Sequence, residues 1–157
     1  MHSRTTLLLS LGSLLCAGGA SAGPVTDSAM TYEAASRTAE SITGPVTLSQ
    51  SSIAFGNGAS VALKLVEDGV GGSWDGLDGS GPGQIFELAG DPGALLNGNT
   101  LCGPGTASYL VASAATRYGM KTLTLAVFQG DTVPTGADGA DLCGTYGYDA
   151  DDPRPAR

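Results

Sequence analysis

The sequence predicts an all-β fold, either a small antiparallel β-barrel or a β-sandwich of about six to eight strands, held by one disulfide. Short apolar runs recur at hairpin spacing and are separated by turns rich in glycine, of which the 157 residues contain 25. The connections between the runs carry no amphipathic helical pattern. A parallel sheet with crossover helices is therefore disfavoured.

Residues 1–22 have the organisation of a secretory signal peptide. A basic opening precedes an apolar core at 7–17, and Ala-Ser-Ala at 20–22 matches a cleavage motif. The apolar core is shorter than the roughly 20 residues of a spanning helix. We expect the mature chain to begin at Gly23, to lack membrane insertion and to reside in the periplasm or outside the cell.

The charge balance restricts the class of partner. The chain has a formal net charge of −8, and loss of Arg4 with the signal peptide changes it to −9. Nucleic acids and anionic membrane surfaces are bound mainly through lysine and arginine, so neither is an expected partner. The acidity favours a basic partner, or serves solubility alone.

Only Cys102 and Cys143 remain after removal of the signal peptide. An exported protein meets an oxidising environment, so these two cysteines are expected to form a disulfide worth roughly 4 kcal/mol. A pair of free reactive thiols is the alternative.

The N-terminal segment, 23–43, is only weakly patterned. A strand over residues 36–43 is favoured. The alternative is a helix beginning after Asp27, which would bring Glu33 and Arg37 together at i, i+4.

The β domain is expected to span residues 44–148. Apolar and polar residues alternate in 46–55 and again in 61–65, and Asn-Gly at 57–58 predicts a tight type I′ turn between two strands. This is the strongest hairpin pattern in the chain.

Glycine and proline mark the remaining boundaries. The expected elements are a surface loop at 67–83, a strand at 84–89, a turn at 90–93, a short strand or single helical turn at 94–96, a hairpin of strands at 107–114 and 121–128, a loop at 130–141, a last strand at 143–148 and a frayed polar tail at 149–157.

The mature chain contains no histidine, since the only one is His2. Histidine-dependent triads and dyads and the usual zinc sites are thereby excluded. We expect a protein that is not an enzyme and that uses no cofactor or metal. A carboxylate-dependent hydrolase is an alternative, although the sequence identifies no facing pair of acids.

The loops at 67–83 and 130–141 are the expected contact surfaces. The candidate binding residues are Trp74, Asp75, Asp78, Arg117, Tyr118, Asp138 and Asp141. Trp74 suits either a partner contact or a plug at one end of a barrel, and the plug is favoured. The two aspartate pairs have carboxylates three residues apart, as calcium ligands would, but neither pair follows a known calcium motif and solvated surface charge is the simpler interpretation.

One local resemblance concerns Ser-Ala-Ala-Thr-Arg-Tyr at 113–118, followed by a strand that ends in Phe-Gln-Gly-Asp at 128–131. This segment resembles the active loop of the MliC/PliC-type lysozyme inhibitors, small exported bacterial β-barrels in which Ser-Gly-x-x-Tyr enters the lysozyme cleft. It covers fewer than 20 residues, lacks the glycine after Ser113 and places Tyr118 one residue later. The resemblance implies a periplasmic inhibitor of a basic hydrolase, with Ser113, Arg117 and Tyr118 as contacts.

The competing interpretation of the same segment is an ordinary hairpin turn with its bend at Gly119. More broadly, the chain resembles small secreted bacterial β-proteins. The expected function is that of an exported, non-enzymatic binding module for a protein or a small ligand.

Overall fold

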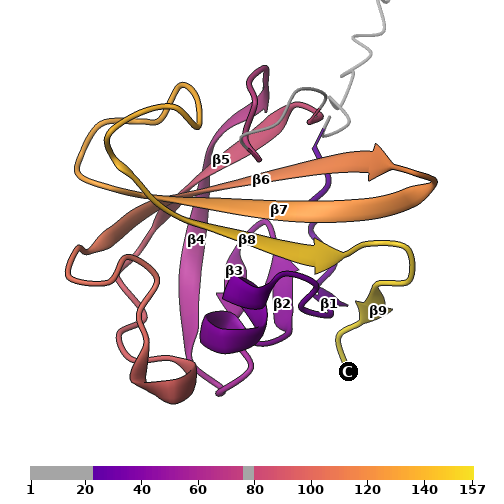
Figure 1. The fold of residues 1–157 in the computed structure, drawn as a ribbon, viewed down its shortest axis with the longest axis horizontal. Coiled ribbons are helices and arrows are strands. Elements are labelled where there is room, and N and C mark those ends of the chain that lie inside the picture. The colour runs from indigo at the N-terminus through magenta and orange to yellow at the C-terminus, as the bar shows by residue number, and fades with distance from the viewer. Residues whose placement is uncertain (1–22, 76–79) are drawn as a thin grey trace, which may run out of the picture.

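The computed structural model describes residues 23–75 and 80–157. The expected signal peptide and Asp78 lie outside these residues. The described chain is mostly strand and forms one curled antiparallel sheet of nine strands, a half-barrel (Figure 1). The expected all-β class is confirmed. In the described residues all nine strands belong to this one sheet, so the fold is not a sandwich of two separate sheets.

The strands are β1 (Met30–Tyr32), β2 (Val46–Ser49), β3 (Ser52–Ala54), β4 (Ser60–Val70), β5 (Gly83–Leu88), β6 (Ala107–Arg117), β7 (Met120–Gln129), β8 (Leu142–Asp149) and β9 (Arg154–Pro155). Two short helical turns accompany them, η1 (Ala39–Thr43) and η2 (Leu96–Gly98). The strand count exceeds the expected six to eight because β1 and β9, of three and two residues, fall in segments where the sequence shows no alternation.

The sheet is a meander in which β8 to β1 follow one another in sequence order, and β9 pairs with β1. The two ends of the meander meet where Ala34 forms a bridge with Tyr148. The amides of Ala35 and Ser36 donate to the Gly147 carbonyl at 2.9 and 3.1 Å. The segment after β1 therefore lies along β8 and joins the curled sheet to itself.

Alternating side chains divide the sheet into two faces. The concave face carries the main core, which includes Leu48, Ile53, Phe86, Leu110, Leu123, Leu125, Tyr146 and Tyr148. The convex face of β5, β6 and β7 carries a second, smaller core of Trp74, Ile85, Tyr109, Val111, Ala126 and Phe128. Strands β6 and β7 are consequently buried on both faces, which accounts for their nearly continuous apolar sequence.

The start of the expected mature chain is fixed to the sheet by the buried side chain of Gln84. Its Oε1 accepts the Val25 amide at 2.7 Å, and its Nε2 donates to the Val25 carbonyl at 3.1 Å. The Gln84 side chain thus bonds both backbone groups of Val25, as the backbone of a neighbouring strand would. These bonds attach residues 23–26 to the domain.

The segment at 36–43 is a turn of helix, so the expectation of a strand there is wrong. The hydroxyl of Ser36 accepts the amide of Ala39 at 3.1 Å, which fixes the start of the turn. At its end, the Thr43 hydroxyl bonds both the Ala39 carbonyl and the Tyr148 hydroxyl, the latter at 2.7 Å. A tertiary contact to β8 therefore selects the helical form.

The two hairpin turns differ in their backbone conformation. Strands β3 and β4 pair as predicted, but Asn57 has no positive φ, so the turn is not type I′. Instead Gly58 alone has a positive φ, and bonds from Gly58 to Phe55 and from Phe55 to Ala59 close a longer loop. The turn between β6 and β7 does have two positive φ angles, 52° at Tyr118 and 81° at Gly119.

The C-terminal tail is not wholly frayed, because Arg154 and Pro155 pair with β1. Arg154 also forms an ion pair with Glu33. Within the described ranges, no helix is long and apolar enough to cross a membrane.

Candidate functional site

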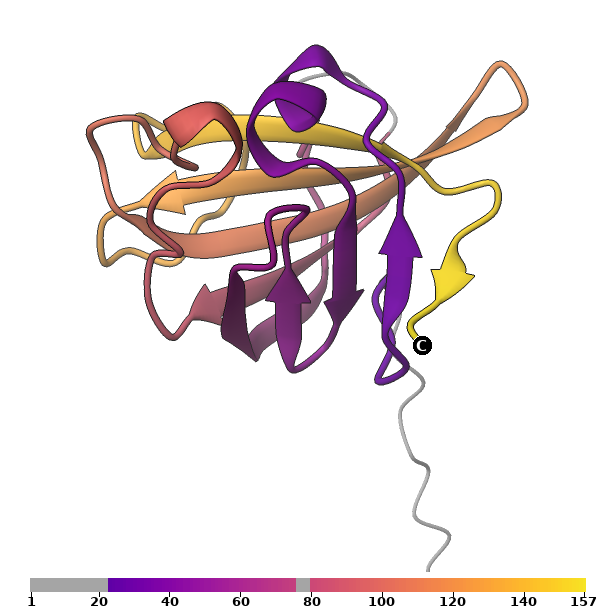
Figure 2. The same cartoon turned by 90° about the horizontal axis from the view of Figure 1, so that it is seen from below.

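The hairpin of β6 and β7 projects beyond the rest of the sheet (Figure 2). At its tip the Tyr118 side chain is fully exposed, at 100%, and Met120 is 57% exposed. Two large apolar side chains thus occupy the most prominent point of the hairpin without contributing to either core.

An ion pair on the convex side of the hairpin holds the residues next to its tip. The guanidinium of Arg117 lies 2.7 Å from the Asp75 carboxylate, and only 33% and 11% of the two side chains are exposed. Partial burial limits the screening of this pair by solvent. The structure therefore brings together Asp75, Arg117 and Tyr118, three of the residues predicted from sequence.

Trp74 is completely buried, so its expected place in a binding surface is wrong. The indole Nε1 donates to the Val70 carbonyl at 2.9 Å, and the ring meets Phe128 edge-on at a centroid distance of 6.2 Å. The side chain is structural, as the favoured interpretation held. It covers the convex face of the sheet, however, and does not plug an end.

The two long loops lie side by side around one hollow of about 400 Å³. Gly72 and Ser73 line it from one loop, and residues 135–138, including Asp138, line it from the other. Asp141 lies outside this hollow, near Gly130. In residues 23–75 and 80–157, no three acidic, histidine or cysteine side chains gather as metal ligands would.

A second hollow, of about 420 Å³, opens at the base of the projecting hairpin on its concave side. Its wall includes Tyr32 from β1 and Lys121 from β7. Neither residue was a candidate from sequence, because β1 has no alternating pattern and Lys121 reads as an ordinary strand residue. The only available sign was a lysine at the start of an otherwise apolar run.

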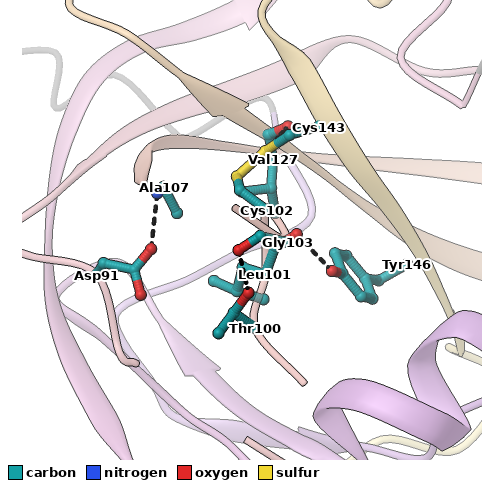
Figure 3. Close-up of a disulfide and its surroundings, with 9 residues drawn as sticks. All are labelled: Asp91, Thr100, Leu101, Cys102, Gly103, Ala107, Val127, Cys143 and Tyr146. Atoms are coloured by element: carbon teal, nitrogen blue, oxygen red, sulfur yellow. Dashed lines mark hydrogen bonds between the residues drawn. A yellow bond between two sulfur atoms is a disulfide. The ribbon is translucent and has the colours of Figure 1, made fainter. Parts of the chain in front are cut away.

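The disulfide between Cys102 and Cys143 is confirmed, with the two Cα atoms 4.9 Å apart. It ties the loop before β6 to the first part of β8, and the Tyr146 hydroxyl donates to the Leu101 carbonyl of the same loop at 2.7 Å (Figure 3). A Cβ added at Gly144 would lie 2.9 Å from that carbonyl. The loop is thus packed closely against β8.

Acidic side chains also line a third hollow, which contains Glu87, Asp91 and Asp131. Asp91 accepts the backbone amides of Gly93 and Ala107, each at 2.7 Å, and Glu87 faces Lys64 at 3.9 Å. Two of these carboxylates therefore have structural partners.

Burial alters the acidity of the core tyrosines. It raises the pKa of Tyr146 to about 12 and raises the pKa of Tyr148 further. Burial also raises the pKa of Tyr32 above its ordinary value. All three phenols therefore ionise only at a higher pH than an exposed tyrosine does.

Comparison with known proteins found no matching family model, no matching curated protein and no matching solved structure.

Proposed function

We propose that the protein is an exported, non-enzymatic binding module that contacts a macromolecular partner with the tip of the β6–β7 hairpin. The observation that carries the proposal is Tyr118, a fully exposed aromatic residue in a left-handed backbone conformation. That conformation costs a non-glycine residue about 1 kcal/mol or more. Folding gains nothing in return from the exposed side chain, so a role in recognition is the explanation that fits a tyrosine at this position.

The composition and rigidity of the tip support the same function. Tyrosine and arginine are enriched among the residues that dominate binding energy in protein interfaces, and methionine adapts to irregular apolar surfaces. The bond between Arg117 and Asp75 holds the base of the tip in place. A tip that is already ordered loses less conformational entropy when it binds.

The packing of the main core also favours recognition at the surface. Away from the hollow beside the hairpin, packed side chains occupy the concave face, and the fully buried ones include Phe86, Leu110 and Tyr146. The net charge of −8 favours a basic partner through electrostatic attraction.

A second candidate function is inhibition of a basic hydrolase such as lysozyme. It is favoured by the narrow, projecting form of the hairpin (Figure 2), which suits insertion into a substrate cleft, together with the acidic charge. Ser113 would not take part directly, because it lies four residues from the turn and is buried. A carboxylate-dependent hydrolase has less support, since Glu87 and Asp91 face structural partners.

The experiment is affinity capture from exported fractions with two baits, the wild type and Tyr118→Asn. Asparagine tolerates the left-handed conformation, so the backbone of the turn is preserved. Val66→Asn removes a 41% exposed apolar side chain from β4 and is the control. We expect a partner that binds the wild type and the control and binds Tyr118→Asn at least tenfold more weakly.

A partner retained equally by all three baits, or no specific partner, would overturn the proposal. Inhibition is tested separately by the clearing of a bacterial cell suspension with c-type and g-type lysozymes. Undiminished lysis at excess protein would remove this second candidate.

A further inference from the structure

We infer that the hollow at the base of the β6–β7 hairpin binds a small amphipathic anion, with a carboxylate at Lys121 and Tyr32 and an apolar body between the hairpin and the segment after β8. This site is separate from the proposed contact at the hairpin tip and takes a different class of ligand. Its volume, about 420 Å³, lies in the range of small-molecule sites.

The walls of the hollow are mainly apolar. Ala114 and Leu123 face it from the two strands of the hairpin, and Ala150 and Pro153 close it from the segment between β8 and β9. Ala114 and Leu123 are directly paired across β6 and β7, so both side chains lie on the concave face. An apolar body of a ligand would be shielded from water on opposite sides.

Tyr32 supplies a hydrogen-bond donor inside this apolar wall. Tyr32 is only 6% exposed and forms part of the wall of the hollow. A phenolic hydroxyl is a hydrogen-bond donor, and a carboxylate oxygen is a strong acceptor. A ligand carboxylate in the hollow would therefore accept a hydrogen bond from Tyr32.

Lys121 supplies the charge. Its ammonium group forms no ion pair with residues 23–75 or 80–157, whereas Lys64 and Arg117 both have acidic partners. No aspartate or glutamate lines the hollow. Asp151 accepts the backbone amide of Lys121 but is not part of the wall. Lys121 is therefore the one charged residue in the described wall of the hollow, and its ammonium group would favour an anionic ligand over a neutral or a cationic one.

The test compares three probes with one apolar chain and different head groups: decanoate, decanol and decylammonium. Binding to the full mature protein is measured by isothermal titration calorimetry below the aggregation concentration of each probe. We expect decanoate to bind about tenfold or more tightly than decylammonium, with decanol between them.

Variants assign the binding to this hollow. Lys121→Met should weaken decanoate binding about fivefold or more and remove its advantage over decanol, whereas Lys64→Met makes the same charge change outside the hollow and should have no effect. Tyr32→Phe should weaken decanoate severalfold. Ala114→Leu should fill the hollow and abolish binding of all probes.

Tyr118→Asn, at the tip of the hairpin, should leave decanoate binding unchanged. Failure of this site and failure of the hairpin contact are therefore distinguishable.

Equal affinity for the three head groups, an unchanged affinity in Lys121→Met, or no detectable binding of decanoate would each overturn the inference. A larger side chain in Ala114→Leu can also disturb the packing of β6, so a second measurement uses the wild-type protein. This measurement follows the NMR resonances of the Leu123 methyl groups. Decanoate should shift them, and unshifted resonances at saturating decanoate would contradict the site.

Discussion

Tyr118 is held in a conformation that its side chain does not favour. Asparagine occupies the left-handed region more readily than tyrosine, and the exposed phenol makes no stabilising contact that would be lost. We expect Tyr118→Asn to raise the free energy of unfolding by about 1 kcal/mol. Urea denaturation followed by circular dichroism measures this.

In the described residues, Asn97 is the other non-glycine residue with a positive φ, and it already has a preferred side chain. Asn97→Tyr should destabilise by more than about 1 kcal/mol, because it also removes the hydrogen bond from Asn97 to the Ser41 carbonyl. A loss of stability in Tyr118→Asn would mean that the tyrosine contributes to folding, which would weaken the argument for recognition.

Gly83 allows Trp74 to approach the backbone of β5. A Cβ at this position would lie 2.6 Å from the indole Nε1 and 2.7 Å from Val111 Cγ1. Gly83→Ala should therefore destabilise the protein by about 1–3 kcal/mol, since both neighbours belong to a packed core. The fluorescence of Trp74, the only tryptophan, should shift to longer wavelength as the indole becomes hydrated.

Gly71→Ala is the matched control, because a Cβ there meets nothing within 4 Å and the residue has no positive φ. It should leave both the stability and the emission spectrum unchanged. If Gly83→Ala behaved in the same way, the indole would not be packed as the structure describes.

Individual elements differ in how far the sequence specifies them. Strands β2, β4, β6 and β7 were predictable because their alternation or long apolar runs leave few alternatives. The continuous apolar character of β6 and β7 was a sign, absent from the expectations above, that both faces are covered and that a segment such as that of Trp74 packs on the convex face. Pairings of two or three residues, as in β9, depend on tertiary contacts and leave no pattern.

The disulfide joins the loop before β6 to the first part of β8. Cys102→Ser with Cys143→Ser should lower the free energy of unfolding by about 4 kcal/mol, because the unfolded chain regains the freedom of a loop with a sequence separation of 41 residues. Guanidinium denaturation gives the change.

Hydrogen exchange then locates the effect. Amides that exchange only by global unfolding, wherever they lie, should lose protection by the change in the free energy of unfolding. Amides in residues 99–106 and at the start of β8 should also exchange by local opening in the variant that lacks the disulfide. If these amides lost no more protection than those of the β2–β3 hairpin, the disulfide would act through the unfolded chain alone.

At the scale of the molecule, burial of Tyr146 and Tyr148 links stability to alkaline pH. Because the folded state raises these pKa values above the ordinary value of about 10, it binds the phenolic protons more tightly than the unfolded chain does. Their contribution is complete below pH 10 and is lost as the pH rises towards 12. We expect the free energy of unfolding to fall by about 1.4 kcal/mol per pH unit for each such tyrosine in this range.

Tyr146→Phe should reduce stability at pH 7 by about 1 kcal/mol, through loss of the bond to Leu101, but should make the alkaline decline less steep. Phenolate absorbance near 295 nm follows ionisation directly. Ionisation of both core tyrosines near pH 10 without unfolding would contradict their burial.

The candidate site was less predictable than the fold for a physical reason. Arg117 and Tyr118 could be selected because they lie at a hairpin turn, but the partner of Arg117, Asp75, comes from a loop 42 residues away in sequence. The hollow beside the hairpin requires β1, β7 and the segment after β8 to converge. Such convergence depends on the curl of the sheet, which no local pattern encodes.

Both edges of the curled sheet are protected against pairing with another molecule. At one edge, β9 has only two residues, and one of them is Pro155, which lacks an amide proton. At the other edge, the residues that follow β1 already form hydrogen bonds with β8. Exposed strand margins are where separate molecules join into fibrils. With both margins blunted, concentrated solutions of this protein should resist amyloid growth, and reduction of the disulfide, by loosening the loop beside β8, should be the treatment that first permits it.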